Sequence, residues 1–275
     1  MRYEKQDNGI KIIGKEDFNT KHILECGQIF RFEKINDSEY VVYSKDLRAK
    51  VIENSDGFFI ETTNPDYFVN FFDLDTNYSE IKKRIEDVAP NLTEAIKNGY
   101  GIRILKQDIF ETIVSFIISA NNNIKRIKLI ISRLCKALGT KNGDYYAFPT
   151  AEQLSGRSED FFRGLGLGFR ARYLSEVSNA YSLLIKDNPC AMTDITLEKR
   201  LMEIKGVGQK VANCILLFGF GRKAVFPVDV WIERVYYEMF STEKRTRPQI
   251  KKYFIDKFGD LSGYIQQYLF YSKIN

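Results

Sequence analysis

The spacing of apolar residues divides the chain into a strand-rich first part and a helix-rich second part. Up to about residue 63, short β-branched or aromatic runs at 40–43, 49–53 and 58–62 are typical of strands, with a Ser55-Asp56-Gly57 turn before the last. From about residue 79, apolar residues recur three and four positions apart. The pattern therefore predicts an α+β protein with an N-terminal antiparallel sheet and a mostly helical remainder.

Two helices are predicted with clear ends. Residues 108–120 carry a broad apolar face, which predicts a buried helix that stops at Asn121-Asn122-Asn123. Asn123 is a good N-cap for a second helix, whose apolar stripe runs from Ile124 to Leu138 and ends at Gly139. Residues 140–160 have weak periodicity and are expected to form a polar connection.

The amino-acid composition limits the kinds of partner and catalytic site that the chain can have. The 275 residues are 44% hydrophobic and carry a net charge of +5, which is enough for large cores and mildly favours polyanionic partners. No apolar run reaches the roughly 18 residues that cross a bilayer, and residues 1–15 are polar, so we expect a cytoplasmic protein without membrane contact. His22 is the only histidine, which excludes most Ser-His-Asp and multi-histidine metal sites.

The cysteines are too far apart for a zinc ribbon or a four-cysteine iron–sulfur cluster, and a reduced compartment fits them. They are Cys26, Cys135, Cys190 and Cys214. A catalyst in this chain must therefore use Lys, Asp, Glu, Tyr or Cys.

The most informative stretch is 201–218. A helix is predicted to end near Ile204, Lys205-Gly206-Val207-Gly208 to form a tight hairpin, and a second helix to run from about Gln209 to Phe218. Backbone amides at the start of that helix point outwards and can hold a DNA phosphate without side chains. Gly-Val-Gly alone could equally be a plain connection between helices.

A second segment, 225–236, strengthens the functional reading. Pro227 stiffens an extended approach, and Asp229 stands where an N-cap belongs, ahead of an apolar helical stripe. The helix after Lys210 rises roughly 12 Å, while the return segment can span up to about 33 Å. The chain can therefore bring Asp229 back beside Lys210.

These two residues could perform chemistry on a sugar. A partly buried lysine at a helix N-terminus, where the dipole is positive, offers more neutral amine for attack on a sugar carbon. A nearby carboxylate could stabilise positive charge on the sugar and assist proton movement. Taken singly, Lys210 is more often a solvated helix lysine and Asp229 a plain N-cap.

The chain resembles the helix-hairpin-helix DNA glycosylases and, within them, the 8-oxoguanine DNA glycosylase/lyases. The similarity runs in one order through nearly the whole chain. Besides the hairpin and the Pro-Val-Asp segment, it includes Glu25-Cys-Gly-Gln-Ile-Phe-Arg31, Phe71-Phe-Asp-Leu-Asp75, Gly101-Ile-Arg-Ile-Leu-Lys-Gln-Asp108, Ser115-Phe-Ile-Ile-Ser-Ala-Asn-Asn-Asn-Ile-Lys-Arg126, Gly164-Leu-Gly-Leu-Gly-Phe-Arg-Ala-Arg-Tyr173 and Gln266-Gln-Tyr-Leu-Phe270.

The resemblance implies a twisted antiparallel domain over residues 1–98 and paired helical domains over 99–275, with the helix-hairpin-helix at about 196–218. Lys210 matches the Schiff-base nucleophile and Asp229 the essential aspartate of the family. The implied reaction removes 8-oxoguanine and then nicks the strand by β-elimination.

The resemblance also implies a pocket for the extrahelical base. Gly27 matches the residue whose carbonyl accepts the N7 hydrogen that 8-oxoguanine has and guanine lacks. Cys214 and Phe270 match residues that sandwich the base, and Gln266 matches one that binds its Watson–Crick edge. Without the resemblance, Cys214 and Phe270 read as core residues and Gln266 as a surface amide.

Further positions match DNA-contacting residues. Asn121 matches the side chain that fills the vacated stack, Phe169 the wedge beside the orphaned base, and Arg126 and Arg170 the pair that reads the opposite cytosine. Backbone phosphates are expected at the hairpin, at the start of the helix that follows it, and just after the Pro-Val-Asp segment. That set comprises Lys205, Gly206, Gly208, Val211 and Trp231.

Some positions depart from the family. Trp231 stands in place of a phosphate-contacting histidine, and Asn213 in place of an aspartate. Phe169 replaces a tyrosine and Lys205 replaces a proline. These departures leave open how the protein binds phosphates and which opposite base it prefers. The expected partner is double-stranded DNA containing 8-oxoguanine, bound by a monomer that would be nucleoid-associated in a prokaryote. No cofactor is expected to be required, although the hairpin could hold a monovalent cation.

Three alternatives remain. One is a related glycosylase for oxidised pyrimidine or mispaired adenine, although the endonuclease III branch usually carries a four-cysteine cluster, which is missing after Asp229. Another is an alkylated-base glycosylase, a class that usually lacks the lysine found at 210. The third is a non-catalytic module that uses the hairpin only as a phosphate clamp.

Overall fold

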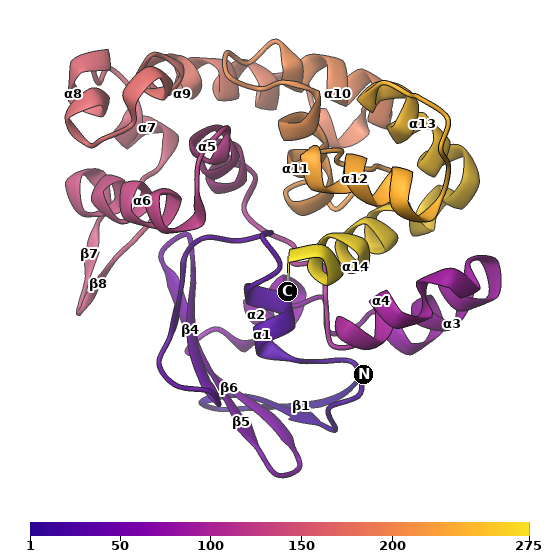
Figure 1. Cartoon of the computed structure of the whole chain (residues 1–275). Coiled ribbons are helices and arrows are strands. Elements are labelled where there is room, and N and C mark those ends of the chain that lie inside the picture. Colours follow the sequence, from indigo (N-terminus) through magenta and orange to yellow (C-terminus); the bar gives the residue numbers. More distant parts are fainter. Residues whose placement is uncertain (275) are drawn as a thin grey trace. The chain divides into compact units, whose positions relative to one another are not determined.

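The computed structural model describes residues 1–274 (Figure 1). The chain divides into two compact units. Unit 1 combines Met1–Val41, Ala49–Lys106 and the chain from Gly221 onward, and unit 2 combines Val42–Arg48 with Gln107–Phe220. The sheet and the largely helical remainder confirm the predicted α+β class. Among the described residues, no helix has the length and apolar character needed to cross a membrane.

A six-stranded sheet has the order β1-β2-β6-β5-β4-β3. The pairs β1–β2, β2–β6 and β5–β6 are antiparallel. Ile10 and Ile12 pair with Ile60 and Phe58, and all four side chains are buried, as alternation on a half-buried strand requires. The strands are β1 Arg2–Gln6, β2 Gly9–Ile13, β3 Phe32–Lys34, β4 Glu39–Ser44, β5 Leu47–Asn54 and β6 Gly57–Glu61.

The helices of unit 1 share a hydrophobic core in which residues 226–271 pack with residues 78–102. Helix α14 packs against α4 and α12, so the C-terminal segment completes a core begun by the N-terminal one. The helices are α1 Thr20–Leu24, α2 Pro65–Phe71, α3 Tyr78–Val88, α4 Thr93–Asn98, α12 Val230–Met239, α13 Arg247–Phe258 and α14 Ser262–Ile274.

Unit 2 is built around α5, which packs against α6, α9 and α11, while α10 packs against α11. The predicted N-cap of α6 is confirmed, because Asn123 accepts from the Arg126 amide. At the start of α5, Asp108 plays the same role by accepting from the Glu111 amide. The helices are α5 Ile109–Ser119, α6 Ile124–Leu138, α7 Ala151–Leu154, α8 Glu159–Gly164, α9 Ala171–Lys186, α10 Asp194–Met202 and α11 Gln209–Phe218.

Two parts of the chain differ from the expected pattern. The strand-rich first part contains the helix α1, and the connection at 140–160 contains the hairpin of β7 Lys141–Asn142 and β8 Tyr145–Tyr146 as well as α7. These elements have only two to five residues each, which is too short for a 3.6-residue or 2-residue period to stand out.

Lys223, on the segment leading to α12, is an unusual lysine of unit 1. Its Nζ is buried without a hydrogen-bond partner among residues 1–274 and lies 5.5 Å from the centre of the Tyr264 ring. Burial lowers the pKa of Lys223 to about 8, the Asp73 carboxylate opposes this shift, and Lys106 adds to it. The folded state therefore disfavours the charged form of this side chain.

Lys223→Met is expected to stabilise the protein most near neutral pH. Because the folded-state pKa lies below that of an ordinary lysine, protonation destabilises the folded state fully below about pH 8, and the penalty fades as the pH rises towards 10.5. We expect the free energy of unfolding to rise by roughly 1–3 kcal/mol at pH 7 and much less at pH 10. Urea unfolding at both pH values measures this.

A matched control is Lys244→Met, because Lys244 is exposed. This control should leave the free energy of unfolding nearly unchanged at both pH values. An equal gain from Lys223→Met at pH 7 and pH 10 would contradict the assigned cause.

Candidate active site and DNA-binding elements

Lys210 is the second residue of α11, in unit 2. Its side chain is half-buried, and its Nζ lies 5.4 Å from the centre of the Phe116 ring, which itself stacks on Phe218. Within unit 2, no acidic side chain forms an ion pair with this amine. Cys214 lies one helical turn further along α11 and is buried, so it shares the face of Lys210.

The hairpin before α11 leaves the first amides of that helix free of side-chain caps. Gly208 is the N-cap and supplies no side-chain acceptor, in contrast to Asp108 and Asn123 at α5 and α6. The first helical amides, which include that of Val211, thus keep their capacity to bind an anion.

Gly206 can only be glycine in this geometry. Its φ is +89°, and a Cβ would lie 2.6 Å from Cδ2 of Tyr173 on α9. The neighbouring Lys205 forms an exposed ion pair with Glu176 at 2.8 Å. A phosphate contact by Lys205 would therefore have to compete with an existing carboxylate.

Asp229 belongs to unit 1 and is the N-cap of α12, as predicted. Its Oδ1 accepts from the amides of Trp231 at 3.0 Å and Ile232 at 2.9 Å. The second carboxylate oxygen has no hydrogen bond within unit 1. The segment 225–228 before it is buried, which fixes the approach of the chain to this carboxylate. The expectation that Asp229 meets Lys210 stays a prediction.

Three residues predicted for the base pocket lie in unit 1. Gly27 has φ +78°, and a Cβ on it would lie 2.9 Å from Cε1 of Phe270, so the two residues touch across the unit. Gln266, one turn before Phe270 on α14, is only 5% exposed and accepts from Gln267 Nε2 at 2.7 Å. Gln266 is therefore not a surface amide.

The loop formed by Asn121, Asn122 and Asn123 in unit 2, here called the asparagine loop, is held in place by Arg170. This arginine is 3% exposed, and its Nε and Nη2 donate to the Ala120 carbonyl at 2.9 and 2.6 Å. Nη2 also donates to the carbonyl of Asn121, an exposed residue with φ +51°, at 2.7 Å. The guanidinium lies 4.3 Å from the ring centre of Phe169, which is 48% exposed. Arg170 thus joins the loop and the aromatic side chain.

Arg126 is more available than Arg170. It is exposed, and its Nη2 donates one hydrogen bond of 3.2 Å to the carbonyl of Gly166. Trp231, in unit 1, is 40% exposed, with the Arg234 guanidinium 5.0 Å from its ring.

Three residues that contact predicted site residues escaped the sequence analysis. Phe116 and Tyr173 lie in segments that were already singled out, but the contact of Phe116 with Lys210 and of Tyr173 with Gly206 depends on packing between helices. Glu176, which pairs with Lys205, carries no sequence signal. Asn213 is buried, and its Nδ2 donates to Glu198 at 2.9 Å, so it links α11 to α10.

Among residues 1–274, no group of three His, Cys, Asp or Glu side chains is arranged to hold a metal ion. Burial raises the pKa of the Cys26 thiol to about 12.

Two family models cover most of the chain. Residues 11–113 match the 8-oxoguanine DNA glycosylase N-terminal domain, and residues 114–258 match the HhH-GPD superfamily of base excision DNA repair proteins. A curated relative, the N-glycosylase/DNA lyase of Saccharomyces cerevisiae, is 31% identical over 261 residues, which are 81% of this chain and 68% of the yeast protein.

Solved structures agree over the full length. The 8-oxoguanine glycosylase/lyase of Clostridium acetobutylicum, in complex with double-stranded DNA containing cytosine opposite 8-oxoguanine, is 32% identical with a TM-score of 0.92, covering 99% of this chain and 97% of that one. MBOgg1 in complex with a low-affinity DNA ligand is 37% identical with a TM-score of 0.92, covering 100% and 99%. The chain belongs to the HhH-GPD superfamily of base excision DNA repair proteins, with an N-terminal domain of the 8-oxoguanine DNA glycosylase type.

Proposed function

We propose that this chain is a bifunctional DNA glycosylase and abasic-site lyase that excises 8-oxoguanine from duplex DNA. The observation that carries the lyase activity is Lys210 at the uncapped start of α11, half-buried against Phe116 and without an acidic partner in its unit. A glycosylase that used water alone would not need an amine there. The matched N-terminal family and the Clostridium acetobutylicum glycosylase/lyase are both named for 8-oxoguanine, which supports the choice of lesion.

In this proposal the Lys210 amine attacks C1′ of the damaged nucleotide. The bond from C1′ to the base breaks, and its electron pair leaves with the base. The nitrogen then loses a proton and the C1′–O4′ bond breaks, with O4′ taking up a proton, so that the opened sugar is held as a Schiff base. This imine makes the C2′ proton acidic, and loss of that proton expels the 3′ phosphate oxygen from C3′. Water then hydrolyses the imine and restores the amine. Asp229 stabilises positive charge on the sugar, since one of its carboxylate oxygens accepts no hydrogen bond within unit 1.

Recognition of the lesion is assigned to Gly27, Gln266, Phe270 and Cys214. The close approach of Phe270 to the glycine at 27 supports a site in which a flat base lies against this ring. A carbonyl acceptor at Gly27 would select the N7 hydrogen of 8-oxoguanine, since guanine would leave that acceptor unpaired. Burial of the Gln266 amide supports its role at the Watson–Crick edge.

DNA binding is assigned to the hairpin and the asparagine loop. The uncapped amides at Gly208 and beyond support a phosphate site, and the exposed Asn121 and Phe169 support insertion into the duplex. We propose that the protein acts as a monomer on double-stranded DNA without a required cofactor. A monovalent cation at the hairpin is compatible with this role.

Borohydride trapping tests the proposed function. Incubation of the protein with a duplex containing 8-oxoguanine opposite cytosine should yield a covalent protein–DNA adduct, because borohydride reduces the Schiff base. The same duplex with guanine in place of 8-oxoguanine should yield no adduct. Absence of an adduct from the damaged duplex would refute lysine catalysis.

The contacts of Arg170 lead to a prediction about opposite-base preference. Its Nε and Nη2 are occupied by loop carbonyls, so Arg170→Met should release the loop of Asn121 and slow excision opposite all four bases, by about tenfold. Single-turnover rates with 8-oxoguanine opposite each base measure this.

Arg126→Met is the matched comparison, because Arg126 keeps more donors free. It should slow excision mainly opposite cytosine. If Arg170→Met slowed excision opposite cytosine alone, Arg170 would act as a base reader rather than as a brace of the loop.

A further inference from the structure

A strip of exposed aromatic and basic side chains follows α12 away from Asp229. Trp231 and Tyr237 are 40% and 37% exposed, and Arg234 between them lies against the Trp231 ring. The Tyr237 hydroxyl donates to the Arg245 carbonyl at 3.0 Å and accepts from the Arg245 amide at 3.1 Å. The strip therefore connects the proposed catalytic carboxylate to the loop after α12.

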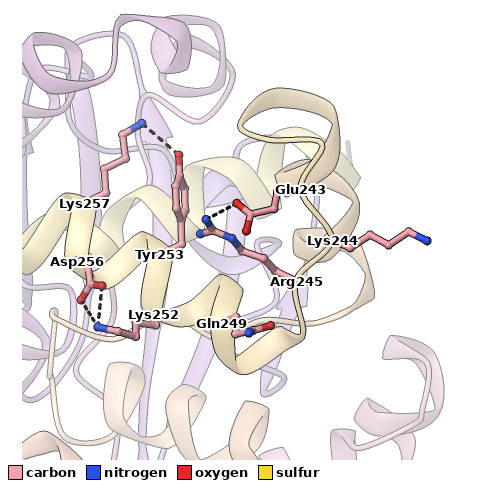
Figure 2. Close-up of a pocket in the computed structure, with 8 residues that line it drawn as sticks. All are labelled: Glu243, Lys244, Arg245, Gln249, Lys252, Tyr253, Asp256 and Lys257. Carbon is pink, nitrogen blue, oxygen red and sulfur yellow. Dashed lines mark hydrogen bonds and ion pairs between the residues drawn. The ribbon is translucent and has the colours of Figure 1, made fainter.

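Two adjoining hollows of about 650 and 610 Å³ lie at the end of this strip. Both are open to solvent, and both are lined by Lys244, Arg245 and Gln249. Figure 2 shows the larger hollow, where Lys244 extends away from the ion pairs formed by its neighbours. The remaining lining residues of this hollow are Glu243, Lys252, Tyr253, Asp256 and Lys257.

The charges of the larger hollow do not cancel. Arg245 pairs with Glu243 at 2.6 Å, and Lys252 pairs with Asp256 at 2.8 Å. Lys244 and Lys257 have no acidic partner among the described residues, which leaves two uncompensated positive charges. The hollow is therefore suited to a ligand with at least two negative charges.

The aromatic side chain in the hollow is not available for stacking. The Arg245 guanidinium lies 5.0 Å and the Lys257 ammonium 5.6 Å from the centre of the Tyr253 ring. With these cations against its ring, Tyr253 offers no clear platform for a nucleobase. Long cationic side chains around an open hollow match backbone phosphates better than bases or a small enclosed anion.

We propose that these hollows form a secondary DNA-backbone site, which binds phosphates of the duplex flanking the lesion. The proposal rests on the proposed function, since it requires DNA to lie at Asp229. Helix α12 has 10 residues and so spans about 15 Å. At about 3.4 Å per base step, this length places the site roughly four to five base pairs from the lesion.

The double variant Lys244→Gln/Lys257→Gln tests the site by removing both uncompensated charges. On a duplex with about ten base pairs on each side of the lesion, the slope of log K against log salt should become shallower by about 2, because two phosphate contacts are lost. On a duplex trimmed to about three base pairs on each side, the variant and the unaltered protein should bind equally. The excision rate at saturating protein should not change.

Two controls test whether the change in salt slope comes from the hollows rather than from the overall loss of charge or of folding. Lys11→Gln/Lys83→Gln removes the same charge from exposed positions elsewhere in unit 1 and should leave binding to the long duplex nearly unchanged. Because Lys257 packs near Phe240 and Phe258, the double variant could fold poorly. The single variant Lys244→Gln, at an exposed position, covers that case. The single variant should show about half the change in slope.

Several outcomes would overturn the proposal. One is a salt slope for the double variant on the long duplex that equals the slope of the control variant. Another is an equal loss of affinity by the double variant on the long and the trimmed duplex. A third is that polyglutamate competes for the protein as strongly as undamaged duplex does. The last result would assign the hollows to an acidic protein. Loss of excision and trapping by the unaltered protein would instead refute the proposed function, whereas normal trapping without flank dependence refutes this site alone.

Discussion

Lys210→Gln is expected to abolish base release, strand nicking and borohydride trapping while leaving duplex binding nearly intact. Glutamine has a similar length but no nucleophilic amine, so both reaction steps should slow by at least about a thousandfold. Binding should persist because the backbone amides that follow Gly208 do not depend on the side chain at 210. Single-turnover excision, gel analysis of nicking and duplex affinity measure the three effects.

Lys199→Gln is a suitable control for this variant, since Lys199 is exposed on the neighbouring helix α10 and loses the same charge. It should keep all activities. Strand nicking retained by Lys210→Gln would show that another residue forms the Schiff base, and a large loss of duplex affinity would show that the lysine serves binding rather than chemistry.

Asp229→Asn is expected to separate the chemical role of this residue from its structural one. Asparagine caps a helix about as well as aspartate does, so the amides of Trp231 and Ile232 keep their acceptor and the free energy of unfolding should change by less than about 0.5 kcal/mol. The negative charge is lost, however, and excision should slow by roughly 10²- to 10⁴-fold.

Asp229→Ala removes both the charge and the cap. It should show the same catalytic loss and, in addition, a free energy of unfolding lower by roughly 1 kcal/mol. Urea unfolding and single-turnover excision of the two variants provide the comparison. Full activity of Asp229→Asn would limit this residue to capping α12.

Much of the helical framework could be predicted from local sequence signals. The apolar stripes and the N-cap residues Asn123 and Asp229 mark the beginnings of α6 and α12, and the Gly-Val-Gly hairpin marks the beginning of α11. These signals depend on residues within one or two turns of each other, so no tertiary contact is needed to interpret them. Helix α1 and hairpin β7–β8 could not be predicted because they are too short to show a period.

The candidate site is predictable only in part. Side-chain chemistry and order along the chain single out Lys210 and Asp229, but neither reveals that Arg170 is buried beneath the asparagine loop or that Lys205 is engaged by Glu176. Likewise, the desolvation of Lys223 arises from distant residues that pack around it. Such properties depend on tertiary packing, which a periodic pattern does not encode.

The division of the chain between its units has a consequence for biosynthesis. Unit 2 ends at Phe220, so its whole sequence is made before the segment from Gly221 onward that unit 1 requires. On the ribosome, unit 2 can fold early, while the apolar side chains of residues 78–102, which later pack with α12 to α14, stay exposed. Chaperone demand during translation should therefore centre on the first hundred residues, although they emerge first.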